Sequence, residues 1–389
     1  MSTVIQATAT DWVAVAREIG ERHRDGAVAA DRAGTPPVEE LEAVRAAGLV
    51  NLRIPREFGG AGEGWLAAAR VVSELASFDP SLGALLAYHY INFVPALLDY
   101  EGDGERIQRL SAENNWLWAN VTQPWVPFEA HPTDDGGFVL NGVKPYNTGA
   151  GVADVFTVLA PRADRREFVY VYVPRDRAGL EFHDDWDHFG FRRSDTVTIT
   201  FHDVVVRPDE VIPDTHPGVR DGFPPLYLAG GSLGFAAILV GAARGALRTA
   251  RELIRSGLVP NSDDPEAIGL LGGLSARVQA AEALRDRVAR QVDDAWERRR
   301  TITVPEIVEL GQRSERLRSF AAQTGIAVGD RVYDVVGPVG LEADRGLDRT
   351  WRDSRIHSLH VNPLIYTHLQ IGDVILNGSE LTGPPFFLD

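Results

Sequence analysis

The sequence predicts an α+β protein of several domains, in which a β domain lies between two helical regions. Three observations support this order. The first third of the chain has apolar residues at helical spacing. From Trp116 onward, short β-branched and aromatic segments alternate with Gly, Pro and Asn-Gly. Long amphipathic stretches return after about residue 226. We expect an N-terminal helical domain at residues 1–115, a β domain at 116–225 and a C-terminal helical bundle at 226–389.

The N-terminal helices are predicted by spacing and by their start signals. Apolar residues recur at helical spacing in four stretches, 11–32, 36–49, 64–78 and 81–100. Residues 36–49 begin with two prolines followed by acids, as helix N-termini prefer. Residues 81–100 are almost entirely apolar, so we expect this helix to be central.

The β domain is predicted by short apolar segments bounded by turn residues. Strand-like segments occupy 116–124, 136–151, 154–160 and 167–174. Residues 196–206 alternate polar and apolar side chains over six positions, which indicates a half-buried strand.

The C-terminal region is predicted to hold three long helices, at 234–257, 264–300 and 304–337, and two shorter ones at 347–360 and 363–376. The most apolar run, 226–245, is rich in glycine and contains Arg244, so a buried helix is favoured over a membrane span. The spacing of Gly241 and Gly245 indicates close helix packing.

Composition excludes several classes of function. The 389 residues carry a net charge of −16, which disfavours nucleic-acid partners and anionic membrane surfaces. The absence of cysteine excludes disulfides, thiolate nucleophiles, iron–sulfur clusters and Cys-ligated zinc. The N-terminus has no secretory pattern, so we expect a cytoplasmic protein. Lys144 is the only lysine.

Taken one at a time, the short motifs of the sequence are weak indicators of function. His357 and His360 lie three residues apart, on one face of a helix, but no HExxH pattern accompanies them and we expect no metal site. His89 lies in an apolar stretch. This position is consistent with a hydrogen-bonded histidine of the core and also with a functional histidine. The absence of GxGxxG and P-loop motifs means that the chain shows no NAD(P)H or ATP fold of its own.

Taken together, the ordered segments resemble the acyl-CoA dehydrogenase superfamily over essentially the whole chain. The matching segments are TQP at 122–124, LNGVKPYNTGAGVAD at 140–154, GFRRSDTVTITFHDVVVRP at 190–208 and RDSRIHSLH at 352–360. The resemblance implies an N-terminal helical domain, a central β barrel and a C-terminal four-helix bundle. It also implies a flavin between barrel and bundle, and a homotetramer.

The chain departs from the dehydrogenases at the catalytic base. A dehydrogenase needs a carboxylate that removes the substrate's α-proton. The two family positions for this group are occupied by Val361 and Pro224, which cannot ionise. Asp221 and Glu380 are displaced candidates for the same task.

A closer resemblance is to the flavin-dependent monooxygenase branch of the superfamily, which includes dibenzothiophene monooxygenase and its sulfur-acquisition relatives. It is carried by AYH at 87–89, WDHFGFR at 186–192, LDRTWRDSRIHSLHVNP at 347–363 and LNGSELTGPPFF at 376–387. The resemblance implies a two-component enzyme that receives reduced FMN from a separate NAD(P)H:flavin reductase. With O₂ it would form a C4a-hydroperoxyflavin and oxygenate a small, largely apolar substrate at sulfur, nitrogen or aromatic carbon.

The same resemblance suggests roles for individual residues. His360 would be the acid/base near the flavin C4a, with His357 as a second candidate and His89 reaching the pocket from the N-terminal domain. Thr148 would contact flavin N5 or the peroxide, and Asn120 would face the ring. The residues expected to bind the cofactor are Thr122, Thr148, Tyr146, Trp186, Arg192 and Ser194. Tyr90 and Trp118 are expected to be apolar walls of the substrate pocket.

Two departures from the branch pattern keep alternatives open. HVNP stands at 360–363 where the branch has HDP, and Val339 stands where a basic residue would reach a phosphate, so Arg244, Arg255 or Arg345 would serve instead. FMN is favoured over FAD. The alternatives are an FAD-dependent, acyl-CoA dehydrogenase-like oxidoreductase with a relocated base, and a non-catalytic flavin-binding homologue.

Overall fold

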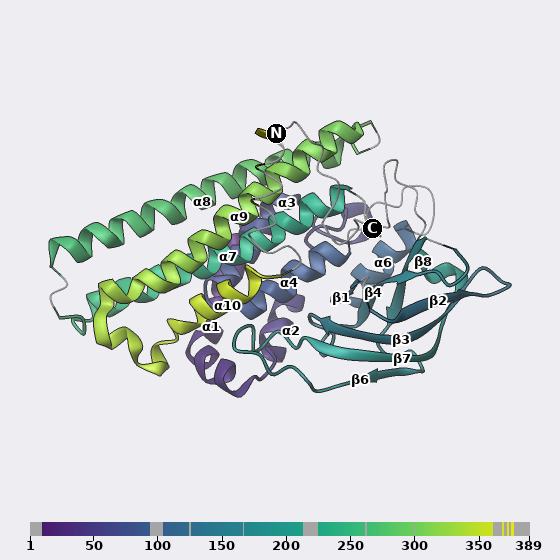
Figure 1. The fold of residues 1–389 in the computed structure, drawn as a ribbon, viewed down its shortest axis with the longest axis horizontal. Helices are drawn as coiled ribbons and strands as arrows, with labels where there is room; N and C mark the ends of the chain where they lie inside the picture. The colour runs from purple at the N-terminus through teal and green to yellow at the C-terminus, as the bar shows by residue number, and fades with distance from the viewer. Residues whose placement is uncertain are drawn as a thin grey trace, which may run out of the picture.

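The computed structural model describes residues 10–93, 104–123, 126–165, 167–212, 225–260, 263–299 and 301–360, together with residues 368, 372, 375 and 376. Figure 1 shows the strands at one end of the molecule and the long helices at the other, with α4 between them. The expected order of helices, strands and helices is confirmed.

Five helices precede the strands among the described residues: α1 (Trp12–Ala33), α2 (Val38–Ala46), α3 (Trp65–Ala76), α4 (Pro80–Asn92) and α6 (Gly104–Asn114). Short 3-10 turns occupy Leu49–Asn51 and Arg56–Phe58. Side-chain caps begin two of the helices, because Asp11 accepts from the backbone of Val13 and Ala14, and Asp79 accepts from that of Ser81. All of α4 is buried, as its apolar composition predicts.

The β domain consists of two four-stranded sheets. One has the order β1-β4-β5-β8 and the other the order β2-β3-β7-β6. The strands are β1 (Trp118–Val121), β2 (Phe128–Pro132), β3 (Phe138–Asn147), β4 (Val155–Pro161), β5 (Phe168–Pro174), β6 (Leu180–Phe182), β7 (Val197–Val206) and β8 (Val211–Ile212). Both sheets contribute to one apolar core, and an isolated bridge between Ala130 and Arg162 joins them.

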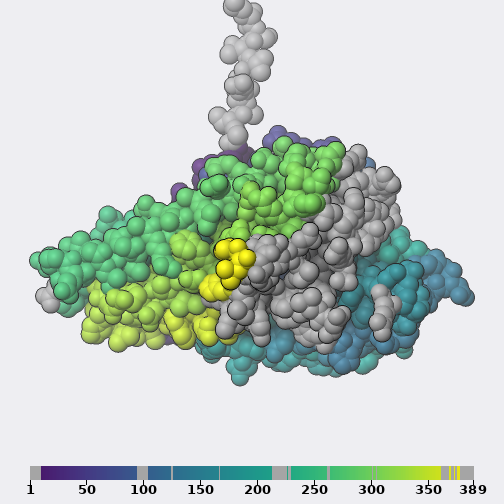
Figure 2. All heavy atoms as spheres, turned by 45° about the horizontal axis from the view of Figure 1, so that its top comes forward, coloured from purple at the N-terminus to yellow at the C-terminus, as the bar shows by residue number. Residues whose placement is uncertain are grey.

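Three long helices and one short helix form the described part of the C-terminal bundle: α7 (Pro225–Arg255), α8 (Pro265–Glu297), α9 (Val304–Val336) and α10 (Asp348–His357). Short 3-10 turns precede α10 at Gly337–Leu341 and Ala343–Arg345. Figure 2 shows the described C-terminal residues in bright yellow beside the bundle, where His368 hydrogen-bonds Ser319 of α9 at 2.6 Å.

Helix α7 is the core of the molecule. The segment Ala229–Arg255 is long and apolar enough to cross a membrane, but 89% of its apolar window is buried in the protein, which confirms the expected buried helix. The close packing expected at Gly241 is also confirmed. A Cβ atom there would lie 2.3 Å from the carbonyl oxygen of Ser73 in α3, so only glycine fits.

Candidate functional site

The two histidines singled out in the sequence lie together at the end of α10. The ring centroids of His357 and His360 are 5.3 Å apart. Phe235 of α7 packs against both, at 4.9 Å from His357 and 5.2 Å from His360. His357 also packs on Phe191, 5.5 Å away. An aromatic cluster therefore surrounds both imidazoles.

Tyr88 of α4 completes this cluster, and sequence reasoning did not single it out. Its hydroxyl group lies 2.9 Å from Nε2 of His360, within hydrogen-bond distance. The Tyr88 and Phe235 rings are 5.5 Å apart. In the tautomer in which Tyr88 donates to Nε2, Nδ1 of His360 carries the hydrogen and can donate it elsewhere.

Both imidazoles are held neutral. Burial lowers the pKa of His360 to about 3, with a smaller contribution from the charge of Arg318. Burial also lowers the pKa of His357, assisted by His360 and Arg318. Within the described part of the chain, neither nitrogen of His357 has a hydrogen-bond partner, nor does Nδ1 of His360. Buried polar atoms are normally satisfied, so these three nitrogens indicate a place for a bound molecule.

His89, the third candidate histidine, faces the other way. Its Nε2 lies 2.7 Å from the carbonyl oxygen of Val50, and its Nδ1 accepts from the backbone N–H of Trp118 at 3.0 Å. Burial lowers its pKa to about 4. Since backbone groups engage both ring nitrogens, the contacts of His89 are those of a core residue, and Tyr88 takes the place expected for it beside His360.

The two expected walls of the substrate pocket make core contacts. Tyr90 donates its hydroxyl hydrogen to the carbonyl oxygen of Leu49 at 2.6 Å. Trp118 donates to the hydroxyl oxygen of Ser111 at 3.0 Å and packs against Phe93, Trp116 and Tyr172. In the described structure neither Tyr90 nor Trp118 contacts His357 or His360, which we call the histidine cluster. Their positions therefore give no support to a role as walls of a pocket beside that cluster.

The expected flavin contacts from the β domain do lie together. Asn120 lies in β1, and Thr122 follows the end of that strand. The hydroxyl group of Thr122 donates to the side-chain oxygen of Asn120 at 2.6 Å. Gln123 donates to the carbonyl oxygen of Tyr146 at 2.8 Å, which ties the end of β1 to the end of β3, two residues before Thr148. Asn120, Thr122 and Thr148 are 7–9% exposed, so these polar groups lie just below the surface.

Helix α4 connects these residues to the histidines. A Cβ atom at Gly149 would lie 3.0 Å from Leu85 of α4 and 3.8 Å from Ala119 of β1. Tyr88 is three residues after Leu85, hence on the same face of α4, one turn further along. Leu85, which contacts the turn that carries Thr148, and Tyr88, which contacts His360, are therefore about 5 Å apart along the axis of α4.

The 186–195 loop contributes the remaining cofactor candidates. Trp186 stacks on His188 at 3.9 Å, and His188 makes an edge contact with Tyr146 at 6.0 Å. Tyr146 is 57% exposed and has a positive φ of 58°, a costly conformation for a large residue. Ser194 is buried and hydrogen-bonds Thr196 at 2.7 Å.

Of the two adjacent arginines in this loop, the structure buries the second. Arg193 forms ion pairs with Glu40 and Asp79. Arg192, the sequence candidate, is half-buried and forms no ion pair with the described residues.

These residues fit a flavin. Its ring requires polar groups that donate and accept without charge on one side and apolar or aromatic groups around it. Asn120, Thr122 and Thr148 supply the first. Trp186 and Tyr146 supply aromatic surface. Oε1 of Gln123 and Nδ1 of His188 are buried without a partner among the described residues.

The alternative phosphate ligands fit less well. Arg244 pairs with Glu74 and Glu282, and Arg345 pairs with Glu342, so their charges are already compensated. Arg255 is exposed at the end of α7. Val361, Pro224, Asp221 and Glu380 lie outside the described residues.

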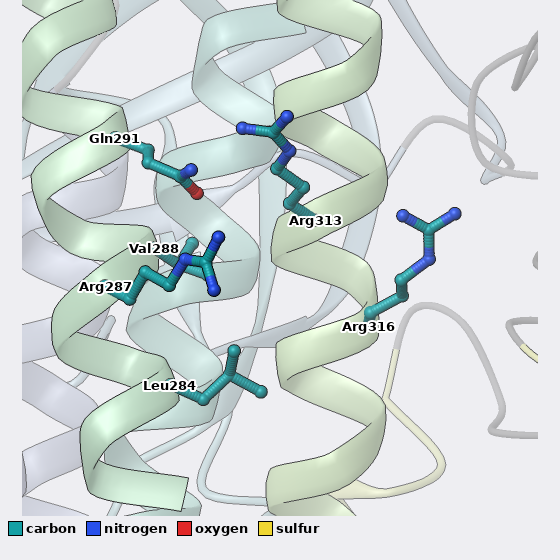
Figure 3. Close-up of a pocket in the computed structure, with 6 residues that line it drawn as sticks. All are labelled: Leu284, Arg287, Val288, Gln291, Arg313 and Arg316. Carbon is teal, nitrogen blue, oxygen red and sulfur yellow. The ribbon is translucent and has the colours of Figure 1, made fainter.

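A separate groove of about 200 Å³ lies between α8 and α9 (Figure 3). It is lined by Leu284, Arg287, Val288, Gln291, Arg313 and Arg316. Arg287 and Arg313 point into the space between the two helices, whereas Arg316 points outward. No residue of the histidine cluster lines this groove.

Lys144 is buried in the β domain. Its ammonium group donates to the carbonyl oxygens of Gln123 at 2.5 Å and Leu159 at 2.7 Å and lies 4.5 Å from the ring of Phe128. Burial lowers its pKa to about 7. The only lysine thus supports the strand end that carries Thr122.

We expect an amine-reactive ester to modify Lys144 at least about 100-fold more slowly in the native protein than in denaturant, because the reaction must await opening of the β domain. Peptide mass spectrometry after timed labelling measures both rates. Similar rates in the two conditions would contradict the burial of this side chain.

Comparison with known proteins places the whole chain in one family. Three domain models of acyl-CoA dehydrogenases match it: the N-terminal domain at residues 7–109, the middle domain at 127–204 and the C-terminal domain at 233–362.

Individual relatives narrow the comparison. A dibenzothiophene monooxygenase of Mycolicibacterium goodii is 34% identical, with 94% of each chain covered. A probable FMNH2-dependent monooxygenase of Pseudomonas putida, SfnC, is 28% identical over 96% of this chain and 97% of its own. The crystal structure of FMN-bound TdsC from Paenibacillus sp. A11-2 has a TM-score of 0.90 and 30% identity, covering 97% of this chain and 100% of TdsC. TdsC has also been crystallised with FMN and indole.

Proposed function

Because the chain belongs to the acyl-CoA dehydrogenase family, in its flavin-dependent monooxygenase branch, we propose that it uses reduced FMN and O₂ to oxygenate a small, largely apolar substrate. The oxygen is inserted at sulfur, nitrogen or aromatic carbon. A separate NAD(P)H:flavin reductase supplies the reduced FMN, since the sequence contains no NAD(P)H fingerprint. The enzyme works in the cytoplasm as a homotetramer.

The observation that carries this proposal is the pair of neutral, aromatic-enclosed imidazoles at His357 and His360. Dehydrogenation requires a carboxylate that takes a proton from carbon. The family positions for that group are Val361 and Pro224. Oxygenation instead requires a site from which water is excluded and a group that holds one proton near the reacting oxygen or transfers it. A neutral imidazole can hold such a proton and can transfer it.

FMN would be held between the β domain and the end of α10. When bound and reduced, it supplies the two electrons that activate O₂. Thr148, Asn120 and Thr122 would donate to and accept from its polar edge. Trp186 and Tyr146 would cover its ring, and Arg192 provides a cation for its phosphate.

His360 holds a proton close to the site where oxygen reacts. Tyr88 fixes its ring orientation through Nε2, which leaves Nδ1 to donate to or accept from the reacting oxygen. Phe235 and Phe191 keep water away from both imidazoles. Exclusion of water matters because a hydrated site would release activated oxygen as peroxide.

The aromatic surroundings favour a planar aromatic substrate. Relatives are dibenzothiophene monooxygenases, and TdsC binds indole. Tyr88, Phe235 and Phe191 offer ring faces and edges against which such a molecule would pack.

The proposal is tested with the purified protein, FMN, a flavin reductase, NADH and ¹⁸O₂, using dibenzothiophene and indole as substrates. We expect one ¹⁸O atom in the product and no product without the reductase. Oxidation of an acyl-CoA thioester by the FAD-loaded protein without O₂ would instead establish the dehydrogenase alternative. Binding of flavin without formation of any product would establish the non-catalytic alternative.

Tyr88→Phe is expected to lower the yield of oxygenated product per NADH about fivefold, because a hydrogen bond worth about 1 kcal/mol is lost at His360. The missing product should appear as hydrogen peroxide, which a peroxidase assay measures. Tyr333→Phe, at a half-buried tyrosine of α9, is the matched control. An unchanged yield in Tyr88→Phe would show that His360 needs no such partner.

A further inference from the structure

Asp353 lies on the buried side of α10, one turn before His357, and is 1% exposed. Its Oδ1 accepts a hydrogen bond from the backbone N–H of Phe191 at 2.6 Å. A Cβ atom at Gly190 would lie 2.9 Å from the same oxygen and 2.8 Å from the carbonyl group of Arg352. The 186–195 loop therefore rests directly on α10 at this point.

A second residue of α10 holds the same loop. Arg352 donates to the carbonyl oxygen of Phe189 at 2.5 Å and pairs with Asp31 of α1, also at 2.5 Å. Within the loop, Trp186 donates from its indole nitrogen to the carbonyl oxygen of Phe191 at 2.8 Å. Phe191 has a φ of 48°, a conformation that persists in a bulky residue only when its surroundings enforce it.

These contacts join the two halves of the candidate site. The backbone N–H of Gly149, next to Thr148, donates to the carbonyl oxygen of Ser194, and that of Ser194 donates to Phe191, both at 3.0 Å. The ring of Phe191 packs on His357. A continuous path of contacts therefore runs from the Thr148 turn through Phe191 to the histidines.

We propose that Asp353 is a positioning residue of the site: its carboxyl group holds the Phe191 peptide, and thereby fixes the 186–195 loop and the Phe191 ring against the histidines. The inference rests on the proposed function for its effect on oxygenation. Its effect on the loop is independent of that function.

The surroundings of Asp353 set its charge. Burial raises its pKa to about 7, while the Phe191 N–H and the charges of Arg349 and Arg352 oppose the rise and that of Asp31 adds to it. Arg349 is shared, because it also pairs at 3.0 Å with Asp79, the residue that caps the start of α4. Oδ2 has no hydrogen-bond partner among the described residues.

The sign of the pH dependence follows from linkage. The folded protein binds the Asp353 proton more tightly than the unfolded chain, so this group's contribution to stability is full below pH about 4 and is lost as pH rises to about 7. Asp353→Asn has no such proton. Between pH 5 and 7 the thermal midpoint of wild type should therefore fall relative to that of Asp353→Asn. Above pH 7 the difference between the two midpoints should become constant.

The experiment compares Asp353→Ala, Asp353→Asn and the control Asp344→Asn, at a carboxylate that is 70% exposed before α10. Hydrogen exchange of residues 189–195 is measured on each protein, followed by product per NADH between pH 6 and 8.5. In Asp353→Ala we expect exchange at least about tenfold faster and a product yield about tenfold lower. In Asp353→Asn, whose amide oxygen still accepts from Phe191, both should return close to wild type.

Unchanged exchange and yield in Asp353→Ala would overturn the proposal. So would an Asp353→Asn variant that behaves like Asp353→Ala, since the accepting oxygen would then be irrelevant. If Asp353→Ala does not fold, the exchange of residues 189–195 in Asp353→Asn decides between the outcomes: exchange as slow as in wild type supports the proposal, and exchange at least about tenfold faster overturns it. If wild type forms no product at all, the proposed function fails, whereas the exchange measurement still tests the role of Asp353 in the loop.

Discussion

Replacing His360 by alanine is expected to lower the rate of product formation by about 10²–10⁴-fold, the range typical of a positioned acid/base group. The reason is local. His360 combines a neutral, buried imidazole with a ring orientation fixed by Tyr88, and its Nδ1 is left without a partner among the described residues. Alanine removes the proton carrier and admits water where activated oxygen must be protected.

The measurement is product and hydrogen peroxide per NADH at saturating FMN, with FMN affinity measured separately by fluorescence. We expect peroxide to account for the lost product while FMN affinity changes less than about threefold, because the residues that we propose to contact the flavin lie mainly in the β domain. His202→Ala, at an exposed histidine of β7, is the control. A wild-type yield of product from His360→Ala would show that His360 takes no part in the reaction. His357 would then be the remaining candidate for the acid/base group.

Replacing His89 by alanine is expected to cost about 3 kcal/mol or more of folding stability, because it leaves two buried backbone groups unsatisfied at about 1–3 kcal/mol each and opens a cavity. Those groups are the carbonyl of Val50 and the N–H of Trp118. Together they connect α4 to the first 3-10 turn and to the first strand. Denaturant unfolding measures the change.

The control for His89 is His131→Ala, at a histidine whose side chain is 51% exposed, where a change within about 0.5 kcal/mol is expected. Acid provides a second check. Because the folded pKa of His89 lies near 4, below its ordinary value, wild type loses stability as pH falls from about 6.5 toward 4. The alanine variant lacks this loss, so the two stabilities should converge in acid. A variant as stable as wild type at pH 7 would contradict the structural role.

Helix boundaries were predictable where the chain carries explicit end signals. Residues 304–337 were expected to form one helix, and α9 runs over Val304–Val336. Pro305 near the start and the capping box of Thr303 and Glu306 explain this agreement, because both signals are local in sequence. Likewise, the motifs around the two histidines at the end of α10 placed them correctly beside each other.

The direction of side chains on buried helices was not predictable. Tyr88 and His89 are neighbours on α4, every residue of which is buried, so apolar periodicity does not distinguish one face from another. Which of them meets His360 depends on Val50 and Trp118, which lie far along the chain. The same limitation applies to the choice between Arg192 and Arg193, because the acids that bury Arg193 are Glu40 and Asp79, which lie far from it along the chain.

The burial of Lys144 has a consequence for the turnover of the molecule. The chain has one ε-amino group, that of Lys144, and this group is enclosed in the folded β domain. The remaining basic side chains are arginines and histidines. Any tag, acyl group or cross-link that attaches to lysine can therefore reach this chain only while that domain is open. Lysine-directed conjugation would mark the unfolded population and leave the native enzyme untouched.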